Sequence, residues 1–126
     1  MKRKGAKSDF SEARNEELRK VFFSQENYST CDAAMKKVIS TPASRFWVDP
    51  DRARDVMSNI ERNPAILDNM KKERARMYRA LFRNYSEIRR ANPEKSKISC
   101  VSTAIFGGAP EFFLSPATAR EIIYRR

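Results

Sequence analysis

The chain repeats part of itself. Residues 43–57 align without a gap on residues 109–123, and five of the paired positions are identical. The identical pairs are Ala43/Ala109, Phe46/Phe112, Pro50/Pro116, Ala53/Ala119 and Arg54/Arg120. A chain of 126 residues with such a repeat is expected to contain two copies of one small unit, each built in the same way.

Each copy joins a short apolar segment to the start of a helix. Phe46-Trp47-Val48 is rich in residues that favour extended structure. Asp49-Pro50 then offers a capping side chain followed by proline at the first helical position, and Ser115-Pro116 does the same in the second copy. The apolar residues that follow recur at i, i+3 and i+4, which predicts one buried face. They are Ala53, Val56 and Met57 in the first copy and Ala119, Ile122 and Ile123 in the second. Arg54 and Arg120 lie beside that face, where each either pairs with a carboxylate or reaches a phosphate.

The remaining pattern is helical throughout. Residues 1–10 are expected to form a flexible basic tail, and a helix is expected to begin near Ser11. Short helices are predicted to end at Thr41-Pro42 and at Gly107-Gly108, and the longest helix covers 64–91. We therefore expect an all-α fold of about six helices in two tandem helix-turn-helix-like units, with a short extended aromatic segment before each Pro-started helix. The first unit spans 11–62 and the second spans 63–126.

One stretch of the chain carries most of the net charge. Residues 71–97 contain ten Lys or Arg against three acidic residues, so they account for +7 of the total of +10. At 100° per residue, one set of cations falls within about 60° of arc, opposite the apolar positions. The set is Lys72, Arg76, Arg79, Arg83 and Arg90. Such a concentration of positive charge favours a polyanionic partner, nucleic acid above all.

The sequence lacks the residues that several kinds of function require. Histidine is absent, and no phosphate-binding glycine loop, nucleophile motif or metal-ligand spacing occurs, so we expect no enzyme, no metal and no cofactor. No run of about 18 apolar residues exists, which predicts no membrane span. Cys31 and Cys100 are isolated, and each is either a small buried hydrophobe in a reducing cytoplasm or half of a disulfide. We expect a cytoplasmic protein.

A longer helix, a turn and a short helix occur twice, which is the order of a helix-turn-helix motif. In that motif the second helix enters the major groove of DNA. The candidate groove contacts are Lys36 and Lys37 in the first copy, with Lys95, Lys97, Ser99, Ser102 and Thr103 in the second. The sequence therefore favours DNA as the partner.

Two resemblances accompany this interpretation. Ser99 to Thr103, followed by Leu114-Ser115-Pro116-Ala117-Thr118-Ala119-Arg120, resembles the recognition helix and third helix of lactose-repressor-type DNA-binding headpieces. The loop lengths differ, and that family's first helix and its Arg-Val-Leu-Asn run are missing. The resemblance implies a helix that reads DNA.

The segment 42–48 with Arg52-Ala53 is similar to a Pro-Ala-x-Arg-Phe-Tyr-Val…Arg-Ala signature. That signature occurs in small proteins of Bacteroidota and their phages or mobile elements. This second resemblance implies a setting and no activity.

Other partners stay open at this point. A protein-interaction or structural module could bind an acidic protein through the basic face, as an oligomer or not, with Trp47, Phe46, Phe112 and Phe113 as interface anchors. RNA could stack on Tyr28, Tyr78 or Tyr85. The helical positions of Tyr78 and Tyr85 on the apolar side argue against RNA.

Overall fold

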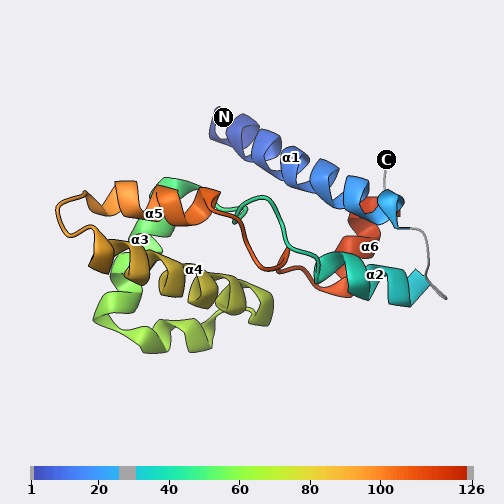
Figure 1. Cartoon of the computed structure of the whole chain (residues 1–126). Helices are drawn as coiled ribbons and strands as arrows, with labels where there is room; N and C mark the ends of the chain where they lie inside the picture. Colours follow the sequence, from blue (N-terminus) through green and yellow to red (C-terminus); the bar gives the residue numbers. More distant parts are fainter. Residues whose placement is uncertain (1, 26–30, 125–126) are drawn as a thin grey trace. The chain divides into compact units, whose positions relative to one another are not determined.

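The computed structural model describes residues 2–25 and 31–124, with side chains described in 11–25 and 33–124. Within these ranges the chain forms six α-helices and one 3-10 helix, without a β-strand (Figure 1). The elements are α1 (Lys2–Ser24), α2 (Cys31–Ile39), α3 (Pro50–Arg62), η1 (Pro64–Asn69), α4 (Lys72–Ala91), α5 (Lys97–Phe106) and α6 (Pro116–Tyr124). The expected all-α fold is confirmed.

The helices form two compact units. Unit 1 consists of residues 1–43 and 110–126, and unit 2 consists of residues 44–109. In unit 1, α6 packs on α1 and α2, whereas in unit 2, α3 packs on α4 and α5. The third helix of each copy of the repeat is thus grouped with the first two helices of the other copy. The compact units differ from the consecutive stretches 11–62 and 63–126, because the chain leaves each copy within the extended segment that follows its short helix.

One backbone hydrogen bond marks this exchange in each unit. The Phe46 N–H donates to the carbonyl of Ile105 at 2.9 Å, and the Phe112 N–H donates to the carbonyl of Ile39 at 3.2 Å. Ile39 ends α2, and Ile105 lies at the end of α5. Each aromatic segment is therefore anchored to the short helix of the other copy.

The structural equivalence of the two copies extends beyond the segments 43–57 and 109–123 that align in sequence. Ile39 and Ile105 are separated by the same interval as Phe46 and Phe112, so the alignment continues without a gap through both short helices. The burial pattern agrees with this register. The buried residues Ala34, Met35 and Val38 of α2 pair with Cys100, Val101 and Ala104 of α5, which are also buried.

Both Pro-started α-helices begin with the side-chain cap that the sequence predicts. The carboxylate of Asp49 accepts a hydrogen bond from the Arg52 N–H at 3.1 Å, and the Ser115 hydroxyl oxygen accepts one from the Thr118 N–H at 3.2 Å. These side chains satisfy N–H groups that a helix leaves without an internal partner. Both predicted caps are confirmed.

The apolar face behind these caps is buried with one exception. Ala53 and Met57 are fully buried in unit 2, and Ala119, Ile122 and Ile123 are buried in unit 1. Val56 is only half-buried. Cys100 is a buried free thiol in the core of unit 2, while the side chain of Cys31 lies outside the described residues.

Two predicted helix boundaries were wrong. The expected helix over 64–91 is divided, because Met70 and Lys71 are extended between η1 and α4. This corner lets η1 pack on both α3 and α4 and buries Leu67. At the other end of the chain, α1 begins at Lys2 where a flexible tail was expected, since Lys, Arg and Ala all favour a helix.

Candidate nucleic-acid interface

The cations on one side of α4 are presented to solvent. Lys72, Arg79, Arg83 and Arg90 are exposed, whereas Arg76 is half-buried. The opposite side of α4 carries the buried residues Ala75, Tyr78, Leu81 and Tyr85. None of the four exposed cations forms an ion pair or hydrogen bond with any residue in the described part of the chain. We call these four residues the basic face of α4.

The short helix α5 presents a polar side with one aromatic residue at its end. Its buried side contains Cys100, Val101, Ala104 and Ile105. The other side carries Ser99 and Ser102, which are half-buried, and Thr103 and Phe106, which are exposed. The Thr103 hydroxyl donates to the carbonyl of Ser99 at 2.9 Å, which leaves the oxygen of that hydroxyl able to accept a hydrogen bond.

A hollow lies between α4 and the end of α5. Its volume is about 260 Å³, and its lining residues come from one turn of α4 and from the end of α5. They are Asn84, Glu87, Ile88, Thr103, Ala104 and Gly107. Around α4, Glu87 lies only about 40° from Arg83 at 100° per residue, so the hollow borders the basic face. Unit 2 therefore places the basic face and the polar side of α5 next to each other.

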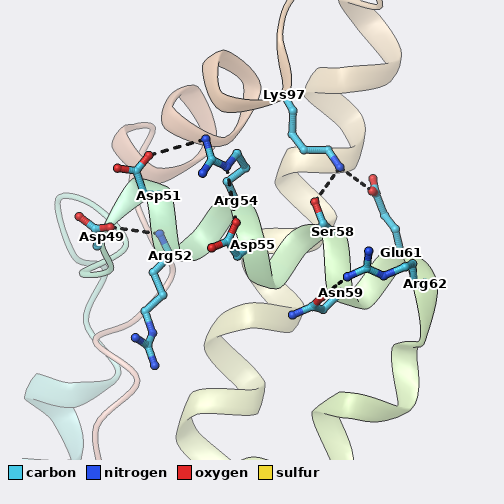
Figure 2. Close-up of polar contacts among 10 residues, drawn as sticks. All are labelled: Asp49, Asp51, Arg52, Arg54, Asp55, Ser58, Asn59, Glu61, Arg62 and Lys97. Carbon is cyan, nitrogen blue, oxygen red and sulfur yellow. Dashed lines mark hydrogen bonds and ion pairs between the residues drawn. The ribbon is translucent and has the colours of Figure 1, made fainter.

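Lys97 has a structural partner instead of a free ammonium group. Its Nζ donates to the Ser58 hydroxyl and to Oε1 of Glu61, each at 2.9 Å, and both partners lie on α3 (Figure 2). Lys97 thus fastens α5 to the helix that comes from the other copy. Lys95, in the preceding loop, is exposed.

Glu61 is the centre of this polar cluster. Its Oε2 accepts a hydrogen bond from the Tyr85 hydroxyl at 3.1 Å, and Nη1 of Arg89 lies 3.5 Å from that hydroxyl. Burial acts to raise the pKa of Glu61, but the hydrogen bonds from Lys97 and Tyr85, with the charges of Lys97 and Arg89, lower it below its ordinary value. The cluster joins α3, α4 and α5 and contributes no free charge to the basic face.

The two candidate lysines of the first copy lie in unit 1. Lys36 and Lys37 are both exposed on α2. In the extended alignment they occupy the positions of Ser102 and Thr103 on α5. Lys36 and Lys37 therefore occupy the same pair of positions as Ser102 and Thr103, and this pair is cationic in unit 1 and neutral in unit 2.

Arg45, from the repeated segment, has a role that sequence reasoning missed. Its guanidinium carbon lies 4.8 Å from the ring centre of Trp47 and 4.4 Å from that of Phe106. The same group donates to the carbonyls of Phe46 and Val48 at 3.0 and 2.9 Å. Burial lowers the pKa of Arg45, against the opposing effect of Asp49. Arg45 therefore holds the extended segment against the end of α5.

Most of the candidate aromatic anchors lie in the core. Phe46, Phe112 and Phe113 are buried, and Trp47 is half-buried. Tyr78 and Tyr85 are also buried, which removes them as stacking platforms for RNA bases, and Tyr28 lies outside the described residues.

Arg54 was expected either to pair with a carboxylate or to reach a phosphate, and the structure shows it beside two carboxylates. Its guanidinium pairs with Asp51 at 3.8 Å and with Asp55 at 3.7 Å (Figure 2). The two carboxylates are well exposed on α3, whereas Arg54 is half-buried.

Among the described residues no three His, Cys, Asp or Glu side chains gather as metal ligands would. No helix in the part of the chain described here has both the length and the apolar character that crossing a membrane requires. No protein-family model, curated protein or solved structure matches the chain.

Proposed function

We propose that this chain is a non-enzymatic, cytoplasmic DNA-binding protein. The basic face of α4 contacts phosphates, and the short helices α5 and α2 contact the groove and its edges. The observation that carries this proposal is the presence of four exposed cations on one helix face that have no partner among the described residues. Cations held ready in this way neutralise phosphates and release the counterions condensed on the duplex.

The polar side of α5 supports duplex DNA within this class. Ser99, Ser102 and Thr103 are small enough to allow close approach, and hydroxyl groups contact both base edges and phosphates. Because the basic face borders the hollow beside α5, one duplex can meet both surfaces of unit 2. In unit 1, the exposed Lys36 and Lys37 on the equivalent helix α2 contact the groove and the phosphates at its edges.

Salt dependence tests the proposal. Each phosphate neutralised contributes about −0.9 to the slope of log affinity against log salt, so four contacts give a slope near −3.6 and about a 100-fold loss between 50 and 200 mM salt. The measurement is fluorescence anisotropy of a labelled duplex of mixed sequence with the full chain. Absence of binding at low salt would reject the proposal.

A matched pair of variants locates the contact. Removing both Arg79 and Arg83, as R79A/R83A, should make the slope shallower by about 1.8. Substituting Arg54 and Arg62 on α3, as R54A/R62A, removes the same charge from residues that have partners within the chain and should leave the slope nearly unchanged. Equal losses from both pairs would mean that only net charge matters.

The alternative is a protein-interaction or structural module of a phage or mobile element that binds an acidic partner. A separate observation favours it: Phe23 and Tyr124 are exposed by 67% and 57%. Both lie beside Phe22 in unit 1, with ring centres 5.0 and 6.3 Å from that of Phe22. Light scattering after size exclusion, without nucleic acid, distinguishes this alternative. A stable oligomer that F23S/Y124S converts to a monomer would support it.

A further inference from the structure

We propose that the hollow between α4 and α5 recognises a base edge in the major groove of duplex DNA, namely the exocyclic amino group of adenine or cytosine. Asn84, Glu87 and Thr103 are the recognising residues. This inference rests on the proposed DNA binding and adds to it the chemical group that is recognised.

The lining of the hollow has the chemistry that such an amino group requires. An asparagine amide can pair with N6 and N7 of adenine, a glutamate carboxylate accepts from N4 of cytosine, and a threonine hydroxyl can pair with either base. Ile88 and Ala104 complete the lining with apolar atoms.

Glu87 is the residue that distinguishes base recognition from simple phosphate binding. It is exposed, and in the described part of the chain it forms no ion pair. It nevertheless lies four residues after Arg83 and three before Arg90, so it faces nearly the same way as the basic face. A carboxylate there repels phosphate. A ligand seated on this surface must therefore bring a hydrogen-bond donor to Glu87 while its phosphates meet the arginines.

Duplex DNA presents both phosphates and amino donors. At a given position of one strand, only some bases carry an amino donor in the major groove. Adenine and cytosine carry amino donors in the major groove, whereas guanine O6 and thymine O4 are acceptors. An acceptor placed against the Glu87 carboxylate would be repelled. The hollow should therefore prefer adenine or cytosine over guanine or thymine at one position.

Differences between the two copies confine this recognition to unit 2. The position of Thr103 is occupied by Lys37 in the first copy, where a cation would attract phosphate. Gly107 borders the hollow without a side chain, and its counterpart is Thr41. A Cβ atom added at Gly107 would lie 3.2 Å from the Thr103 carbonyl oxygen, a close contact at the edge of the hollow.

Selection from a library of randomised duplexes tests the inference with the full chain. The wild type should enrich adenine or cytosine at one position, and N84A and E87A should each reduce that preference by about 5- to 150-fold. E87A should also bind random duplex more tightly than the wild type, because it removes a repulsive charge. E94A is the matched control, since Glu94 is exposed in the loop after α4 and lies outside the hollow.

The possible results separate the two proposals. Salt-dependent binding without any base preference would overturn the inference and leave DNA binding intact. A preference for guanine or thymine would also overturn it, as would a preference that survives both N84A and E87A or that E94A abolishes equally. No binding to duplex at low salt would overturn the proposed function and this inference together.

Discussion

Arg45 holds an extended segment against the end of α5 by stacking and by hydrogen bonding at the same time. Its guanidinium lies beside the rings of Trp47 and Phe106, and its edge donates to the carbonyls of Phe46 and Val48. A planar cation with several donors can do both, whereas an ammonium group cannot. The arginine of the repeated segment is thus part of the architecture of unit 2.

Substitution of Arg45 should therefore destabilise the protein. We expect R45A to lower the free energy of unfolding by about 2–3 kcal/mol, from lost hydrogen bonds to a charged group and lost cation–π contacts. R45K should recover less than half of this loss. Urea denaturation followed by circular dichroism measures the effect, with R79A as a control that should change stability by less than about 0.5 kcal/mol. Full recovery by lysine would show that charge alone matters at this position.

Glu61 makes stability depend on pH in a defined direction. Its pKa in the folded protein is lowered, so its stabilising contribution is present above the ordinary carboxyl pKa and is lost as the pH falls through the folded value. At pH 7 we expect E61Q to cost about 0.5–1 kcal/mol, a small figure because the side chain is 42% exposed.

The difference between wild type and E61Q should shrink as the pH falls well below about 4.3, the ordinary glutamate value. Urea denaturation at several pH values measures it, and E94Q serves as the control. A difference that stays constant with pH would show that Glu61 acts through packing and not through its charge.

Single residues were predictable where their partners are close in sequence. The caps at Asp49 and Ser115 bond to residues three positions away, and both were predicted correctly. The partners of Lys97 lie 36 and 39 positions away on α3, and Phe106 lies far from Arg45 in the chain. No local pattern contains that information, so Lys97 was assigned to DNA and Arg45 to no role.

At the scale of elements, the two Pro-started α-helices α3 and α6 are built alike. Both begin with a side-chain cap followed by proline, and both bury an alanine and two larger apolar residues behind it. Because α3 and α6 each complete a unit made of helices from the other copy, the start of each helix should influence a whole unit.

Removal of either cap should have a similar cost. We expect D49A and S115A each to reduce the free energy of unfolding by about 1 kcal/mol. D49N and S115T retain an acceptor at the same position and should lose much less. Thermal and urea denaturation measure these effects. A loss in D49A that D49N repeats would assign the effect to the charge of Asp49 instead of the cap.

The division of the predicted long helix shows the limit of helical patterns. Leu67 keeps the spacing of the apolar face of α4, and so the sequence predicted one helix over 64–91. In the structure Leu67 is buried where η1 turns back against both α3 and α4. Packing with a neighbouring helix outweighed the local periodicity, which tertiary context commonly does.

At the scale of the whole molecule, the exchange of third helices determines which parts of the chain can fold alone. Unit 2 is one continuous stretch, 44–109, whereas unit 1 needs residues from both ends of the described chain. The repeat predicted two copies but could not predict the exchange, because equivalent helices have nearly the same apolar face and either could fill either position.

Two fragments test this arrangement. We expect residues 44–109 to be helical and to unfold cooperatively, since they contain α3, η1, α4 and α5. Residues 63–126 contain the second copy without α3 and should not form a stable monomer. Circular dichroism, denaturation and light scattering measure both. A monomeric 63–126 as stable as 44–109 would mean that α6 can serve its own copy equally well.

The exchange also sets an order of events during synthesis. A ribosome completes all of unit 2 before it reaches α6, while α1 and α2 are made before unit 2 and have no third helix until Pro116–Tyr124 emerges. One link in unit 1 joins Arg19 to the carbonyl of Ile122 across 103 positions. The α1 and α2 helices are therefore enclosed only after all of unit 2 has been made, and their apolar surface must stay protected from aggregation until α6 has emerged.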